Sequence, residues 1–166
     1  MNPISTKDPR FLLRTATPDD AALVVSFMKK LGAYQKMADK VTVTAQDIHQ
    51  LMTDKKGEAV FGMYDGQPVA FVYFCQTSSA FTGQSGLYID AFLVDDAMRA
   101  KGLGKTMMAF LSKLALDRGC QRLEWGCLDW NLPAIGFYSS LGATAVDAMT
   151  IHRFGPEQLK ANAAAF

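Results

Sequence analysis

Arg99-Ala-Lys-Gly-Leu-Gly-Lys-Thr106 is the stretch of sequence that decides the fold of this chain. It follows an apolar run rich in strand formers, Leu87 to Val94, and it leads into apolar positions that repeat with helical spacing up to Arg118 and Gly119. The order is therefore strand, glycine loop, helix. Glycine leaves no Cβ in the way of a ligand, and the first amides of a helix attract anionic oxygens. The stretch predicts a loop that binds a diphosphate.

Two better-known glycine motifs do not fit these residues. A Walker A loop requires glycine five positions before Gly104, where Arg99 stands, and the dinucleotide fingerprint requires glycine or alanine at Met107. The residues from Arg99 to Gly104 instead match the pattern Arg/Gln-x-x-Gly-x-Gly/Ala, in which x is any residue. This pattern resembles the acyl-CoA loop of the GNAT superfamily of N-acetyltransferases. The alternative is a glycine-rich turn that binds nothing.

A second segment, Asp129 to Ala143, resembles the same superfamily. Asn131 is a good N-cap with Pro133 in the first turn behind it, and Gly142 ends the expected helix. In the superfamily, the second acyl-CoA segment begins its helix with an asparagine and carries an aromatic pair, here Phe137-Tyr138. The resemblance extends over residues 87–143, and it implies one N-acetyltransferase domain over residues 1–166.

The expected fold is α/β (α+β): a central mixed, mostly antiparallel sheet of six to seven strands with helices on both faces. Asp65-Gly66 is a strong hairpin signal between two of the expected strands. The strands expected from the residues are 10–16, 58–64, 68–76, 87–94, 123–127 and 143–154. The expected helices are 19–30, 44–52, one from Leu103 that closes at Arg118-Gly119, one that begins at 131, and 156–165, and 78–85 is expected to be a loop.

Composition excludes several classes of protein. The chain has 166 residues, a formal net charge of +1 and 49% hydrophobic residues, which suits a globular core and offers no basic surface for nucleic acid. No apolar run reaches the length of a membrane span, and polar residues near Met1 argue against a signal peptide. Cys75, Cys120 and Cys127 lack metal-ligand spacing, so we expect free thiols, no metal and a cytoplasmic location.

The resemblance implies acetyl-CoA as co-substrate and assigns residues to it. The strands at Leu87 and Leu123 are expected to splay apart, so that the pantetheine arm pairs with one of them like an added strand. The diphosphate takes backbone amides of the glycine loop. The cofactor residues are Phe92, Leu93, Val94, Arg99, Lys101, Gly102, Leu103, Gly104, Lys105, Thr106, Asn131, Phe137 and Tyr138.

Amide formation requires one group that accepts a proton and one that protonates the departing thiolate. Tyr138 stands where the superfamily commonly has its general acid, and a phenol is protonated at neutral pH; the alternative is that it only packs beside Phe137. Asp90, the acid within an apolar strand, is the candidate base because partial burial would raise its pKa. The alternative for Asp90 is a side chain that points to solvent.

The chain looks most similar to the spermidine/spermine and thialysine acetyltransferase branch, which implies a homodimer and an amine acceptor held by Tyr34, Gln35 and Asp90. It departs from that branch at Gln35, Lys36 and Ala91, where fewer acids would meet a polycation. A diamine, polyamine, amino acid or lysine-like amine stays open as the acceptor. The alternatives are a protein N-terminal or lysine acetyltransferase, and an acyl-CoA-binding module without catalysis.

Overall fold

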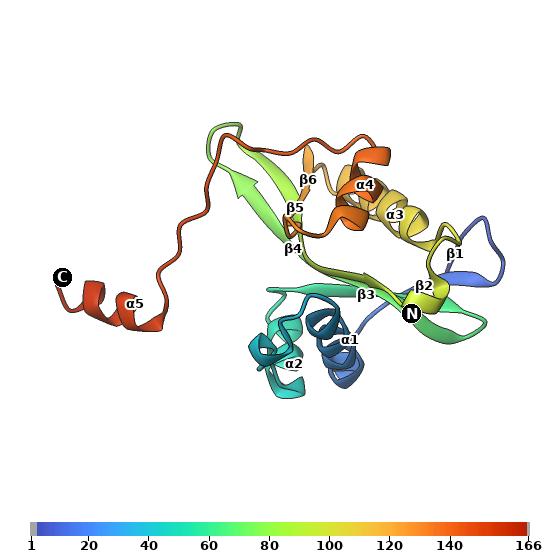
Figure 1. Ribbon diagram of the computed structural model, residues 1–166, viewed down its shortest axis with the longest axis horizontal. Coiled ribbons are helices and arrows are strands. Elements are labelled where there is room, and N and C mark those ends of the chain that lie inside the picture. Colours follow the sequence, from blue (N-terminus) through green and yellow to red (C-terminus); the bar gives the residue numbers. More distant parts are fainter. Residues whose placement is uncertain (1–2, 166) are drawn as a thin grey trace. The chain divides into compact units, whose positions relative to one another are not determined.

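The computed structural model describes residues 3–165, in two compact units of which one extends to Gly126 and the other begins at Cys127. The first unit contains a six-stranded sheet in which strand order follows chain order (Figure 1). Its strands are β1 (Ile4–Ser5), β2 (Phe11–Thr15), β3 (Glu58–Tyr64), β4 (Gln67–Ser79), β5 (Gln84–Val94) and β6 (Arg122–Trp125). Neighbours are antiparallel except β5 and β6, which pair in parallel. The predicted mixed sheet is confirmed.

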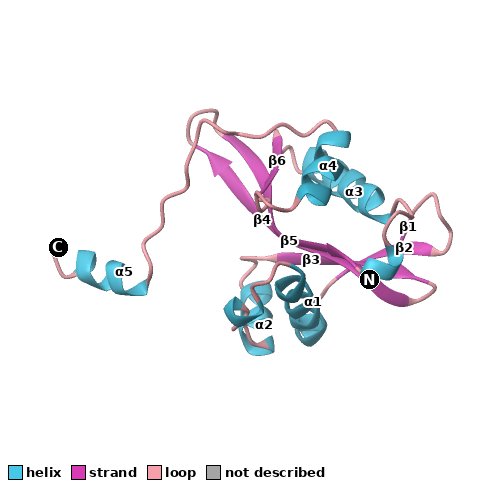
Figure 2. Ribbon diagram, in the orientation of Figure 1, coloured by secondary structure: helices cyan, strands magenta, loops and turns pink. Residues whose placement is uncertain are grey.

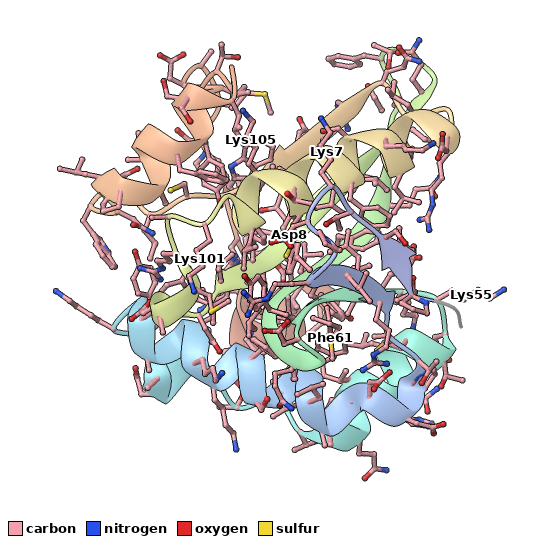
Figure 3. The ribbon with its side chains drawn as sticks, turned by 90° about the vertical axis from the view of Figure 1, so that its right-hand side faces the viewer. Lys7, Asp8, Lys55, Phe61, Lys101 and Lys105 are labelled. Carbon is pink, nitrogen blue, oxygen red and sulfur yellow. The ribbon has the colours of Figure 1, made fainter. Side chains whose placement is uncertain are left out.

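Helices lie on both faces of this sheet (Figures 1 and 2). On one face are α1 (Ala21–Tyr34) and α2 (Ala45–Thr53), and on the other is α3 (Leu103–Asp117). The core under α1 is aromatic: the Phe27 ring lies 5.0 Å from that of Phe71 and 5.9 Å from that of Phe61, which Figure 3 labels. All three side chains are buried. Burial of such rings supplies much of the free energy that holds α1 on the sheet.

Turn chemistry explains several boundaries. Asp65 and Gly66 both have positive φ, 48° and 79°, as the predicted two-residue hairpin turn between β3 and β4 requires. The next turn is tighter than predicted: β4 and β5 continue until only residues 80–83 connect them. The predicted loop over 78–85 is therefore too long at both ends, because polar side chains do not prevent two strands from pairing at an exposed end.

The first helix differs from the prediction at both of its ends. A short 3₁₀ turn, η1 (Pro18–Asp20), precedes α1, which then continues one turn past the predicted end at Lys30 and reaches Tyr34. Arg14 on β2 donates to both carboxylate oxygens of Asp20, each over 2.9 Å, and the Thr17 amide donates to the same carboxylate over 2.8 Å. These bonds fix the start of the helix relative to the sheet.

The second unit contains α4 (Leu132–Ser140) and α5 (Pro156–Ala163). Asn131 caps α4 by accepting a bond from the Ala134 amide, as predicted. The strand predicted over 143–154 is wrong, since residues 141–155 form neither strand nor helix. A strand needs a neighbour for its backbone groups, and no strand lies among residues 127–165 of this unit.

Candidate functional site

The glycine loop has the geometry expected of an anion site at the start of a helix. After β5 the chain makes a 3₁₀ turn, η3 (Asp96–Met98), and Gly102 then caps α3 with φ +78°. A Cβ at Gly102 would meet nothing within 4 Å, so backbone conformation rather than space favours glycine there. Gly104 lies inside the first turn of α3 and is not among the residues with positive φ. The Thr106 amide donates to the Gly102 carbonyl over 3.0 Å, and the three amides before it, at the start of α3, have no acceptor within the helix, which suits them to bind phosphate oxygens.

Two side chains of the loop lie over aromatic rings. The Arg99 guanidinium is 4.5 Å from the centroid of the Tyr34 ring and pairs with Asp96 over 2.7 Å. The Lys101 ammonium is 5.6 Å from the centroid of the Tyr64 ring. Figure 3 labels Lys101 in the loop and Lys105 in the first turn of α3. Tyr34, predicted to hold the acceptor, thus lies against the glycine loop.

The middle of β5 is interrupted by a β-bulge. Tyr73 pairs with Ala91 and Phe74 with Ile89, so Asp90 is the extra residue between two paired positions. Asp90 is exposed, whereas Ile89 and Ala91 on either side are buried. The bulge explains how an acid fits into an apolar strand, because it turns the carboxylate out of the core.

The pairing of β5 with β6 ends just before the bulge. Ile89 is opposite Trp125, the last residue of β6, so β5 continues through Phe92, Leu93 and Val94 without β6 beside it. The divergence of these two strands, which the family resemblance implies, stays a prediction, because β6 has no residue beyond Trp125. A strand edge of this kind is suited to pairing with an extended amide chain such as pantetheine.

A pocket of about 450 Å³ lies beside the bulge, on the face of the sheet that α1 and α2 cover. Its walls come from these two helices, the segment between them, β4 and β5. It brings together Asp90 and Gln35, two of the three predicted acceptor residues. The apolar lining includes Met28, Leu31, Met37, Val41, Val43, Ile48 and Leu51, and the polar lining is Gln35, Lys40, Thr42, Asp47, Tyr73 and Asp90.

The ionised groups of the pocket differ in their surroundings. Asp47 accepts bonds from the Thr44 hydroxyl and amide over 2.6 and 2.9 Å, which hold its pKa below the ordinary value. Lys40 pairs with Asp39 over 2.9 Å. Burial raises the pKa of the Tyr73 phenol above its ordinary value, and the nearby charge of Asp90 raises it further. Tyr73 is therefore a protonated donor near Asp90 at neutral pH.

Sequence reasoning missed Tyr73, Lys40 and Asp47 as pocket residues. Tyr73 stands in a continuous apolar run, where no pattern distinguishes a pocket residue from the core. The Thr44 and Asp47 pair is visible in the sequence as a helix start, but only the packing of α2 against α1 turns it toward a pocket.

The remaining predicted residues are in the second unit. Asn131 is buried at the start of α4, and the rings of Phe137 and Tyr138 lie 5.2 Å apart at an angle of 57°. Both rings are half-buried. The assignment of Tyr138 as general acid stays a prediction.

The described residues contain neither a membrane-spanning helix nor a cluster of metal ligands. No helix within residues 3–165 is both long and apolar enough to cross a membrane. Over the same residues, no three His, Cys, Asp or Glu side chains gather where they would hold a metal ion.

Comparison with known proteins defines the class. Residues 26–143 match the acetyltransferase (GNAT) family, so the chain belongs to that family and is an acyltransferase. Thialysine N-epsilon-acetyltransferase of Caenorhabditis elegans is 30% identical over 131 residues, which are 79% of this chain and 81% of the relative. L-ornithine N5-acetyltransferase of Arabidopsis thaliana is 30% identical over 115 residues, 69% of this chain and 47% of the relative.

Solved structures agree in fold. An integron cassette protein from the mobile metagenome of V. cholerae has a TM-score of 0.75 at 21% identity, with 93% of this chain and 98% of that one covered. An aminoglycoside acetyltransferase from a soil metagenome, in complex with trehalose, has a TM-score of 0.76 at 14% identity, with 90% and 98% covered. The predicted family, branch and fold are confirmed.

Proposed function

We propose that this protein transfers an acetyl group from acetyl-CoA to a primary amine of a small molecule. The observation that carries the proposal is the loop from Arg99 to Thr106 at the start of α3. This loop follows β5, which continues past the end of its parallel neighbour β6. The loop amides hold the diphosphate, and the edge of β5 at Phe92 to Val94 holds the pantetheine arm. This arrangement directs the thioester toward the bulge in β5.

Asp90 attracts the acceptor ammonium and takes its proton, since only the neutral amine is a nucleophile. The amine nitrogen then attacks the thioester carbonyl, a carbon–nitrogen bond forms, and the carbon–sulfur bond breaks. Tyr138 gives its phenolic proton to the departing thiolate and takes back the proton that the newly bonded nitrogen must lose, and Asp90 releases its own proton to solvent. The products are an acetamide and free CoA.

We propose a dibasic amino acid as the acceptor. The described pocket residues that carry charge are two acids, Asp47 and Asp90, and one base, Lys40. A dibasic amino acid has two ammonium groups and one carboxylate, which is the complementary set, and its aliphatic arm suits the apolar wall. A polyamine would present only positive charge to Lys40. Relatives named for thialysine and L-ornithine support this choice.

A screen of amines with acetyl-CoA, followed by thiol release, tests the proposal. We expect L-ornithine, L-lysine and thialysine to exceed spermidine and a matched monoamine at least tenfold in kcat/KM, a difference of about 1.4 kcal/mol in transition-state binding. Release with peptides alone would favour a protein acetyltransferase. Binding of CoA with no release for any amine would favour a binding module.

A further inference from the structure

The loop that precedes α3 contains a backbone conformation that its sequence disfavours. Ala100 has φ +60°, in the left-handed region that costs a non-glycine residue free energy. Its two neighbours, Arg99 and Lys101, reach aromatic rings on different elements: Tyr34 is the last residue of α1, and Tyr64 is the last residue of β3. The strained residue therefore lies between two anchored cations.

Other contacts hold the anchors in place. Lys30 on α1 pairs with Asp95 at the start of the loop over 2.9 Å, so α1 is connected to the loop at a second point. The Arg10 guanidinium also lies over the Tyr64 ring, 4.8 Å from its centroid. A cation over a ring face is attracted to it, and ring positions that are fixed by secondary structure make the attraction directional.

We propose that Tyr34 and Tyr64 are positioning residues that form an aromatic clamp, holding the loop between them in its ligand-binding conformation before the ligand arrives. The proposal rests on the proposed function of this loop as the diphosphate site. A loop ordered in advance loses less conformational entropy on binding, so the clamp raises affinity for CoA without touching it. Removal of either ring would then weaken CoA binding, and removal of Tyr64 would leave the chemical step unchanged.

The first experiment measures the Kd of CoA by calorimetry for Tyr34→Leu and Tyr64→Leu. We expect each Kd to rise about fivefold, as loss of a cation–π contact predicts, and kcat of Tyr64→Leu at saturating acetyl-CoA to stay within about twofold of the wild type. Tyr34→Phe and Tyr64→Phe keep the ring and should keep the affinity. Arg10→Gln is a matched control, because it removes the second cation over Tyr64 and leaves the loop contact intact.

The second experiment needs no ligand. Hydrogen exchange of the amides of residues 99–104 should be faster in the free leucine variants than in the wild type, and unchanged in the phenylalanine variants. Wild-type exchange in both leucine variants, or faster exchange with no change in the Kd of CoA, would overturn the clamp. A wild-type protein that binds no CoA would overturn the proposed function instead, and exchange in the free protein would still decide whether the rings order the loop.

Discussion

Asp90 lies exposed at the β-bulge in the middle of β5, where an acid interrupts an otherwise apolar strand. Alternation along β5 leaves open whether an acid at this position faces the core or the solvent. The bulge resolves the question, because Asp90 is the unpaired residue and lies exposed in a pocket with Tyr73. No local sequence signal predicts this bulge, since it depends on the register between β4 and β5.

The residue-scale prediction for Asp90 concerns acid–base chemistry. Asp90→Asn should lower kcat/KM at pH 7 by about 10²-fold, because the amine loses its proton acceptor and its counter-ion. The deficit should shrink as pH rises toward the amine pKa of about 10, since more acceptor is then already neutral. A pH profile of both proteins checks this. Asp54→Asn, outside the pocket, is the control, and equal rates for Asp90→Asn and wild type at pH 7 would contradict the base role.

The proposed general-acid role of Tyr138 can be tested by removal of its hydroxyl group. Tyr138→Phe should keep the fold and the affinity for acetyl-CoA, since one hydroxyl is lost, and lower kcat by about 10²-fold or more. Single-turnover rates are the measurement, because they exclude product release. Phe137→Leu is the control and should reduce thermal stability more than turnover. A wild-type single-turnover rate in Tyr138→Phe would leave its hydroxyl without a role in proton transfer.

Helix starts show what local sequence can specify. Thr44 with Asp47, Asn131 with Pro133, and Gly102 all occupy the positions that capping rules predict for them. Local sequence does not specify which strands pair with each other. Residues 143–154 contain strand formers, yet no strand forms, because pairing depends on residues distant in sequence.

At the start of α3 we predict that Gly104→Val weakens acetyl-CoA binding tenfold or more, a loss of about 1.4 kcal/mol. The reason is the bulk of a β-branched side chain in the first helical turn, since Gly104 itself is helical. Calorimetric titration is the test. Gly136→Val in α4, where a Cβ would meet nothing within 4 Å, is a control for valine in a helix. Unchanged affinity in Gly104→Val would remove the loop from the diphosphate site.

The start of α1 carries a pH-dependent contribution to stability. Bonds from Arg14, and then from Thr17, hold the pKa of Asp20 below its ordinary value despite partial burial. A lowered pKa in the folded state stabilises the fold above the unfolded pKa of about 3.9, and the contribution disappears as pH falls through the folded pKa. Asp20→Asn should therefore cost about 1 kcal/mol at pH 7, and the difference from the wild type should shrink as pH falls through the lowered pKa of Asp20. Denaturant unfolding across this range checks it, and a difference independent of pH would contradict it.

At the scale of the whole molecule we predict a homodimer. The support is resemblance to the polyamine branch, together with apolar side chains that the second unit leaves exposed: Val146, Met149, Ile151 and Phe154 are 66%, 76%, 81% and 63% exposed. Light scattering at micromolar concentration should give twice the chain mass of 18.2 kDa. Ile151→Lys should shift the mass toward the monomer, whereas Lys160→Ala should not. A monomeric wild type would exclude the dimer.

The strand order of the sheet has a consequence for how this chain folds. Five strands pair with the strand before them in the chain, and several of these pairs are close in sequence, β3 with β4 across two residues and β4 with β5 across four. The chain can therefore add them in the order of synthesis, each new strand on an edge already formed. Among the described strands, β3 follows α1 and α2, and β6 follows α3, which forms the crossover that the parallel pairing of β5 with β6 requires. The slowest step in building the sheet should therefore be the addition of β6 through this crossover, so we expect newly made chains to complete the proposed acetyl-CoA site last.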